Sequence, residues 1–170
     1  MHPLLRSRSQ AYALDSAVHL VVPAALIPVG LLLRRRHDRL DPRLVHALSL
    51  LPPAAATLLA SAQESRGGTW GHRSQGLVVR TTDGRRPSLA RALLRNTVKI
   101  GCPWQLGHAV ALGAAQDELD RQHPWTIAAA TAVYLWMAAN ALTAALGSGR
   151  ALHDHVAGTE VKPEAPRREA

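Results

Sequence analysis

Charge is divided sharply along this 170-residue chain. Stretches of about 20 residues that are rich in Ala, Leu and Val alternate with connectors crowded with arginine. A soluble helix mixes apolar and charged residues within each turn or two, because only one of its faces is buried. About 20 consecutive apolar residues are instead what a helix needs to cross the hydrocarbon core of a bilayer. The pattern therefore predicts an all-α integral membrane protein.

Four segments are candidates for membrane-spanning helices, so we expect a bundle of about four transmembrane helices. They cover residues 11–33, 44–62, 96–116 and 126–147. Several contain prolines, which membrane helices tolerate when neighbouring groups satisfy the freed carbonyls. Pro23 and Pro28 predict a kink in the first segment. The Pro52–Pro53 pair leaves open two half-helices in the second, and Pro103 makes the third the weakest candidate.

The connector over residues 63–95 predicts a small folded region at the membrane surface. In it, GLVVR followed by TTDG is typical of a short extended segment entering a turn, because Asp-Gly is a strong turn signal. Ser88 suits the N-cap of a surface helix that leads into the third segment. We expect the transmembrane domain to cover residues 1–161. Residues 162–170 are polar and are predicted to be a disordered tail.

The formal net charge of +8 has three interpretations: nucleic-acid binding, contact with anionic lipid, and the positive-inside bias of membrane proteins. The basic residues lie between apolar segments and no recognition motif accompanies them. We therefore favour the positive-inside bias, expect no nucleic-acid partner, and keep anionic lipid as an open partner. Four spans would place 13 Lys and Arg residues on the side of both termini and six on the other, which predicts cytoplasmic termini. The five arginines over residues 34–43 conflict with this orientation.

Residue types that occur in active sites and metal sites are present, but their spacing matches neither kind of site. Cys102 is the only cysteine, so neither an intrachain disulfide nor a cysteine-based zinc cluster is available. His153, Asp154 and His155 are adjacent and would point in different directions around one ion. The glycines over residues 67–76 lack the Lys-Ser/Thr ending of a phosphate-binding loop. We expect no enzyme activity, no metal and no cofactor.

Three pieces of the sequence, in this order, resemble the RDD family of membrane proteins. Arg8-Ser-Gln-Ala-Tyr-Ala-Leu-Asp15 has the family's R-x-x-A-x-x-x-D pattern. Residues 68–96, GTWGHRSQGLVVRTTDGRRPSLARALLRN, resemble its Gly-Thr-x-Gly loop, and residues 150–161, RALHDHVAGTEV, resemble its closing signature. The resemblance identifies Arg8, Asp15 and Asp154 as the arginine and two aspartates for which the family is named. His72 departs from it, because family members often carry a lysine there. The resemblance implies a membrane domain linked with transport, with no general ligand.

Asp15 is the most informative of these residues, because a carboxylate inside a spanning helix costs about 2.5 to 3.5 kcal/mol unless it meets a partner or a wet cavity. Arg8 shares its helix face but lies about 10 Å away along the axis. We therefore expect a partner on another helix, with Arg95 and Lys99 as candidates. Asp15 and His19 could belong to a proton or cation path, or Asp15 could clamp helices together. We favour the clamp.

Two hypotheses for the function follow from this sequence. In the first, the protein moves a small solute or ion across the plasma membrane of a bacterial cell, which with four spans implies a homo-oligomer or a membrane partner. In the second, it is a structural or assembly module whose arginine-rich loop contacts anionic lipid or a partner protein. Asp154 is expected to accept hydrogen bonds from this loop, with Arg73 or Arg95 as donors. A soluble basic helical protein is the least favoured alternative.

Overall fold

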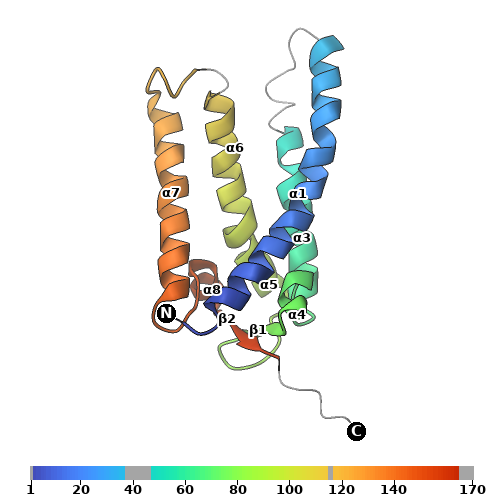
Figure 1. The fold of residues 1–170 in the computed structure, drawn as a ribbon, viewed down its shortest axis with the longest axis vertical. Helices are drawn as coiled ribbons and strands as arrows, with labels where there is room; N and C mark the ends of the chain where they lie inside the picture. Colours follow the sequence, from blue (N-terminus) through green and yellow to red (C-terminus); the bar gives the residue numbers. More distant parts are fainter. Residues whose placement is uncertain (1, 37–46, 115–116, 165–170) are drawn as a thin grey trace.

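Four long helices stand side by side in the computed structural model, which describes residues 2–36, 47–114 and 117–164 (Figure 1). They are α1 (Leu5–Arg36), α3 (Leu51–Glu64), α6 (Cys102–Ala114) and α7 (Pro124–Ala145). Short elements gather at one end of this bundle and form what we term the cap. They are α4 (Trp70–Ser74), β1 (Leu77–Thr81), α5 (Leu89–Asn96), α8 (Leu152–Ala157) and β2 (Thr159–Pro163). Because α1 begins and β2 ends at the cap, both ends of the described chain lie at the same end of the bundle.

The four predicted apolar segments are helical over nearly all of their described residues. The first helix begins at Leu5 rather than at residue 11, because its first turns belong to the cap, where Arg8 is paired. Figure 1 shows α1 bent, with an oblique first half and an upright second half. Proline within a helix is a common cause of such a bend, so the shape agrees with the kink predicted for this segment.

Proline positions also explain the two less regular segments. In the second, residues 47–49 are helical, Leu50 forms a turn, and α3 then begins with its two prolines in the first turn. Proline is tolerated there because first-turn amides have no partner within the helix. This break agrees with the alternative of two half-helices. In the third segment, the π-helix η1 (Thr97–Gly101) leads from α5 into α6, and Pro103 occupies the first turn of α6.

The cap contains a two-stranded antiparallel sheet, in which Leu77 pairs with Pro163 and Thr81 pairs with Thr159. The first strand and the turn after it follow the predicted extended segment, and Gly84 has the positive φ of +84° that this turn requires. Ser88 caps α5 as predicted, because its side chain accepts a hydrogen bond from the Arg91 amide. The sheet modifies the all-α expectation, although the chain is mostly helical.

The second strand departs from the prediction of a disordered tail, which is wrong for residues 162–164. Lys162 and Pro163 belong to β2, and the Glu164 amide donates to the Gly76 carbonyl at 2.8 Å. Gly158 explains the departure, because its left-handed conformation ends α8 and turns the chain back along β1. Val161 then packs with Leu77 and with Ala11 of α1 in a small hydrophobic core. The remainder of the predicted tail, residues 165–170, lies outside the described residues.

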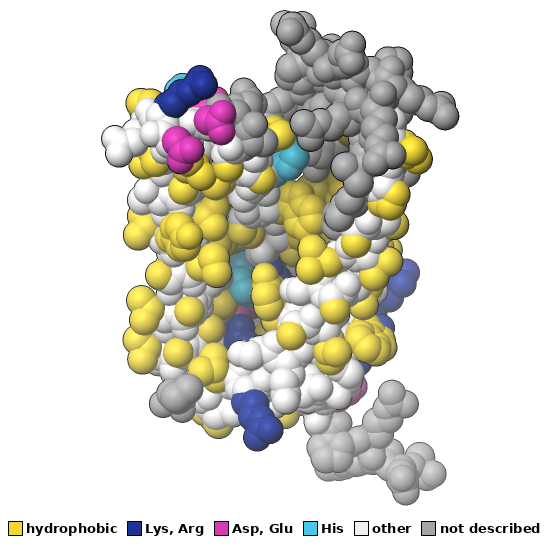
Figure 2. Space-filling model, turned by 45° about the horizontal axis from the view of Figure 1, so that its top comes forward, with side chains coloured by type: hydrophobic (Ala, Val, Ile, Leu, Met, Phe, Trp, Pro, Cys, Tyr) yellow, Lys and Arg dark blue, Asp and Glu magenta, His cyan; other side chains and the backbone are white. Residues whose placement is uncertain are grey.

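Polar and apolar side chains are distributed opposite to the pattern of a water-soluble bundle. The largest fully buried side chains include Arg95, Glu64 and Asn96, whereas hydrophobic side chains cover the sides of the bundle (Figure 2). Within the described ranges, α7 is the one helix that is long and apolar enough to cross a membrane, and few of its residues are buried. Large exposed apolar areas are unfavourable in water and are satisfied by lipid.

Removal of β2 is expected to destabilise the protein, whereas removal of residues 165–170 alone is not. A chain that ends at Gly158 loses the ladder with β1 and the buried side chain of Val161. This loss should lower the free energy of unfolding by roughly 2–4 kcal/mol. Thermal unfolding in detergent micelles measures it, with a chain ending at Glu164 as the matched control. Equal midpoints for the two shortened chains would contradict a structural role for β2.

Candidate functional site

Five charged side chains from five elements meet where the cap joins the bundle and form what we term the ionic cluster. They are Arg8 of α1, Glu64 of α3, Arg95 of α5, Lys99 of η1 and Asp154 of α8. Glu64 and Asp154 have no exposed surface, and Arg95 is 1% exposed. Buried charges are stable only when they are paired and hydrogen-bonded. Arg95, Glu64 and Asp154 meet this condition, because cations and carboxylates alternate through the cluster.

Arg95 joins the two carboxylates of the cluster. Its Nε donates to Oδ1 of Asp154 at 2.9 Å, and its Nη1 donates to Glu64. Arg8 approaches Asp154 from the other side, with its Nη2 donating to Oδ2 at 2.6 Å and its Nη1 donating to the Gly149 carbonyl. Burial by itself would raise the pKa of Asp154, but the neighbouring guanidinium groups hold that pKa well below its ordinary value. Asp154 is therefore a carboxylate at all physiological pH values.

The polar groups around the carboxylates complete their hydrogen bonding. Asp154 also accepts from the Ala151 amide at 3.0 Å and from the Thr159 hydroxyl at 3.3 Å. Glu64 accepts from Nδ2 of Asn96 at 2.7 Å, and the Lys99 ammonium lies 3.8 Å from the same carboxylate. Arg95 keeps a pKa above its ordinary value, because the attraction of the two carboxylates outweighs the effect of its burial.

Asp15 is held by a separate set of contacts at the start of α4. Its Oδ2 accepts from the Thr69 hydroxyl at 2.6 Å, and its Oδ1 accepts from the Gly71 amide at 2.8 Å. Gly71 is required here by close packing, because a Cβ at this position would lie 2.7 Å from the Asp15 carboxylate and would collide with the Ala11 carbonyl. These contacts fasten the middle of α1 to the cap.

A short hydrogen-bonded chain runs from Asp15 through Thr69 to His72. Oγ1 of Thr69 lies 2.6 Å from Nδ1 of His72. Because the single hydroxyl proton goes to Asp15, Nδ1 of His72 is assigned the proton that it donates to Thr69. Burial, followed by the charges of Lys99 and Arg95, lowers the pKa of His72 well below its ordinary value. The ring is therefore neutral near pH 7, with Nε2 as a hydrogen-bond acceptor.

The structure places some of the predicted partners correctly and corrects others. Arg95 donates to Asp154 as predicted, whereas the alternative donor, Arg73, is exposed. The expectation that Arg95 and Lys99 are the partners of Asp15 is wrong, since both face Glu64 and Asp15 bonds to α4.

His19 lies one turn farther along α1 and does not join the ionic cluster. The sequence reasoning missed Glu64, Asn96, Thr69 and Gly71 as members of these polar contacts. Glu64 was detectable as a lone acidic residue at the end of an apolar segment, next to a connector full of arginines.

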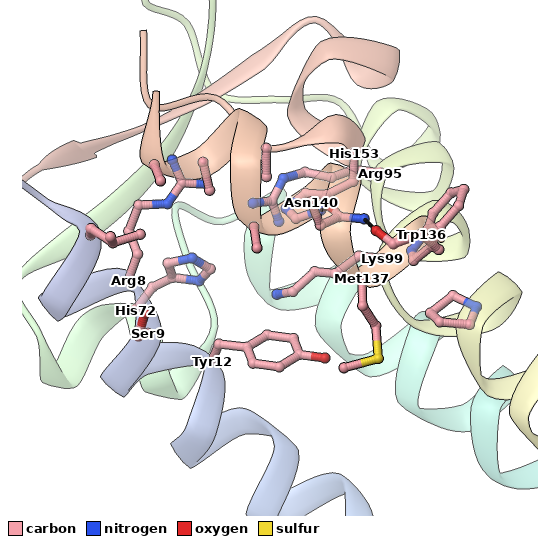
Figure 3. A pocket seen from close by; sticks show the side chains of 16 residues that line it. Arg8, Ser9, Tyr12, His72, Arg95, Lys99, Trp136, Met137, Asn140 and His153 are labelled. Carbon is pink, nitrogen blue, oxygen red and sulfur yellow. Dashed lines mark hydrogen bonds between the residues drawn. The ribbon is translucent and has the colours of Figure 1, made fainter. Parts of the chain in front are cut away.

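A cavity of about 560 Å³ adjoins the ionic cluster between α1 and α7 (Figure 3). The ionic cluster contributes Arg8, Arg95 and Lys99 to its lining, beside the polar side chains of Ser9, Tyr12, His72, Asn140 and His153. The apolar part of the lining consists of Leu5, Pro103, Trp136, Met137 and the alanines of the last turns of α7. Nδ1 of His153 lies 3.0 Å from Oδ1 of Asn140, and burial together with the charge of Arg95 lowers the pKa of this histidine well below its ordinary value. Both cavity histidines are therefore neutral near pH 7.

Comparison with known proteins bears on the same residues. The model of the RDD family matches residues 2–158, nearly the whole described chain. The chain belongs to the RDD family. No curated protein and no solved structure matches it. Of the three residues that the sequence resemblance identifies, Arg8 and Asp154 are paired, and Asp15 holds the start of α4.

The cavity of this RDD-family chain offers hydrogen-bonding groups and positive charge to a ligand. Within the described ranges, no group of three or more His, Cys, Asp or Glu side chains is placed to hold a metal ion. The cations of the cluster are on the wall of the cavity, and the neutral histidines add acceptors and donors beside them. Such a lining can bind and orient a small polar or anionic group.

Substitution of Asp154 by Asn is expected to be strongly destabilising. It removes the anion between Arg8 and Arg95 and leaves their buried positive charges uncompensated, which should cost about 3–5 kcal/mol. Chemical unfolding in detergent micelles measures the loss. Asp83→Asn is the matched control: hydrogen bonds from Thr81 and Arg85 lower the pKa of this exposed carboxyl to about 2, and its removal should leave the midpoint unchanged. An Asp154→Asn protein as stable as the control would refute the central role of this carboxylate.

Proposed function

We propose that this RDD-family protein crosses the plasma membrane four times, with both termini and the cap in the cytoplasm. The arrangement of the helices supports this orientation, since the short connector over residues 117–123 lies at the end of the bundle opposite to the cap (Figure 1). The cap also carries a ring of exposed basic side chains, namely Arg66, Arg73, Arg85, Arg86 and Arg91. Cytoplasmic segments of membrane proteins are enriched in such residues.

Within this topology, we propose that the signature residues act as an assembly clamp. The observation that supports it best is that each of them bonds to an element other than its own: Arg8 to α8, Asp154 to α1 and α5, and Asp15 to α4. A carboxylate that passes a cation along a path needs oxygens that open onto that path. Neither aspartate lines the cavity among the described residues, and their oxygens are already occupied by donors. The exposed arginines of the cap would then contact anionic lipid or a partner protein.

Thiol accessibility in intact cells tests the topology. In a Cys102→Ala background, single cysteines at Arg36, Gly84 and Gln122 are treated with a membrane-impermeant reagent. We expect labelling at 36 and 122 and protection at 84, because the first two positions would lie outside the cell and the third in the cap. Labelling of all three after permeabilisation provides the control for reactivity. Protection at 36 together with labelling at 122 would show that the second segment does not cross.

Transport of a small solute or ion is the second candidate, with one specific observation in its favour. Asp15 is connected through Thr69 to His72, and His72 lines the cavity. Asp15 could therefore exchange a proton with the cavity through two side chains without lining it. In this alternative, His19, Arg95 and Lys99 would set the charge along the path, and two copies or a partner would complete it.

Proton flux into proteoliposomes distinguishes the two candidates. The protein is reconstituted with a pH-sensitive dye inside, and a pH step is applied with a permeant counter-ion. A path predicts a flux that His72→Gln reduces at least about tenfold, the effect expected for loss of a proton-transfer group. A clamp predicts no flux above that of empty vesicles and a lowered unfolding midpoint for Asp15→Asn. Asp83→Asn serves as the control in both measurements, because this carboxylate is exposed and distant from the cavity.

A further inference from the structure

We propose that the cavity between α1 and α7 is a binding site for one anionic phospholipid of the cytoplasmic leaflet, with its phosphate beside Lys99 and its acyl chains along α7. This inference relies on the proposed membrane insertion and not on the clamp. It differs from general contact between the exposed cap arginines and lipid headgroups, because it assigns a defined site with its own charge and shape.

The cations around the cavity line its wall, whereas the carboxylates lie behind them. Arg8, Arg95 and Lys99 line the cavity, whereas the carboxylates of Asp15, Glu64 and Asp154 are not among the described residues that line it. The two histidines at the same end are neutral near pH 7. A group that enters the cavity therefore meets positive charge first, which favours an anion over a cation.

Lys99 is the residue that most clearly lacks a full set of partners. Its side chain is only 7% exposed, and its ammonium carries three N–H donors. Its nearest carboxylate oxygen, on Glu64, is 3.8 Å away, and Nζ makes no hydrogen bond to any residue in the described part of the chain. The other recorded contact is with the Tyr12 ring, 5.8 Å from its centroid. Figure 3 shows Lys99, His72 and Tyr12 directed into the same space. A phosphate oxygen would supply the missing acceptor.

The walls of the cavity favour a lipid over a free anion. α7 packs on α6 and α8, and α1 packs on α3 and α4, so the cavity lies between two helices that belong to different pairs. Figure 2 shows positively charged and histidine side chains at the bottom of a hollow flanked by hydrophobic ones. Trp136 and Met137 lie on the wall beyond the charged end. A soluble phosphate would leave this apolar wall uncovered, whereas acyl chains would pack against it.

The position and size of the cavity agree with a headgroup site. It is closed toward the cap, where the His2 amide donates to the Ala145 carbonyl at 3.2 Å and Arg8 donates to Gly149. Its charged end therefore lies at the junction of cap and bundle, the depth of lipid headgroups in the proposed orientation. The volume of about 560 Å³ accommodates a phosphate, its glycerol and the start of the acyl chains, and lies within the range of small-molecule sites.

Quenching of Trp136 fluorescence by brominated lipid tests the site. The full-length protein with Trp70, Trp104 and Trp125 replaced by Phe is reconstituted in phosphatidylcholine and titrated with phosphatidylglycerol or phosphatidylcholine brominated on the acyl chains. We expect saturable quenching by phosphatidylglycerol, with an apparent affinity about tenfold above that of phosphatidylcholine, equivalent to the contribution of one additional charged contact. Lys99→Met should abolish this preference.

Three further variants keep the test decisive if Lys99→Met fails to fold. Ala141→Phe narrows the cavity without touching a charge and should also abolish the preference, whereas Ala128→Phe, on an exposed part of the same helix outside the cavity, should retain it. Arg85→Gln with Arg86→Gln removes cap charge and should also retain it. Equal quenching by the two lipids, or a preference that survives Ala141→Phe, would overturn the proposal. Displacement of the lipid by millimolar inorganic phosphate would replace it with a soluble-anion site. Failure of the topology experiment with intact lipid preference would instead refute the four-span proposal alone.

Discussion

The carboxylate of Asp154 lies between two guanidinium groups that are far apart in the sequence, those of Arg8 and Arg95. Arg8 reaches it from α1 and Arg95 from α5, and the side chains of Arg95 and Asp154 are almost fully buried. A buried ion network of this kind contributes little net stability relative to an apolar core of the same volume, because desolvation offsets the attraction. The network instead determines which packing of the cap against the bundle is adopted. Any packing of the cap that separated these three groups would leave a charge buried without a partner, at a cost of several kcal/mol.

Asp15 has the complementary role about two turns farther along α1. Helices in lipid gain little from burying apolar side chains against one another, because acyl chains offer an equally apolar environment. Specific polar contacts and close approaches then decide how the helices are placed. Asp15 provides both, since it takes a hydroxyl and an amide from α4 and requires glycine at position 71. Because Arg8, seven residues earlier in the same helix, bonds to α8, α1 is attached to the cap at two points along its length. This second attachment explains why the helix begins before the apolar segment that the sequence predicts.

The sequence predicts the helices of this protein better than it predicts its polar contacts, for a physical reason. Apolar length and proline position are local properties, so the long helices, the break before Pro52 and the N-cap at Ser88 follow from residues that are neighbours in the chain. The partners of Asp15 could not be found in this way. The candidate donors Arg95 and Lys99 pair instead with Glu64, a residue at the end of another helix. β2 escaped prediction for a similar reason, because the segment after Gly158 is polar by composition and becomes ordered only through pairing with β1.

The clamp and the cavity are two consequences of the same placement of charge. Asp154 and Glu64 hold Arg8 and Arg95 from behind, which turns the remaining face of these cations toward the space between α1 and α7. Their charge is then largely compensated, so they shape the field of the cavity without binding a ligand strongly. Lys99 is different, because the nearest carboxylate oxygen, on Glu64, lies 3.8 Å from its Nζ, and Nζ makes no hydrogen bond among the described residues. Asp154 therefore serves the packing of the cap and also sets the charge of the cavity, since its loss would leave the guanidinium groups of Arg8 and Arg95 without this carboxylate beside Lys99.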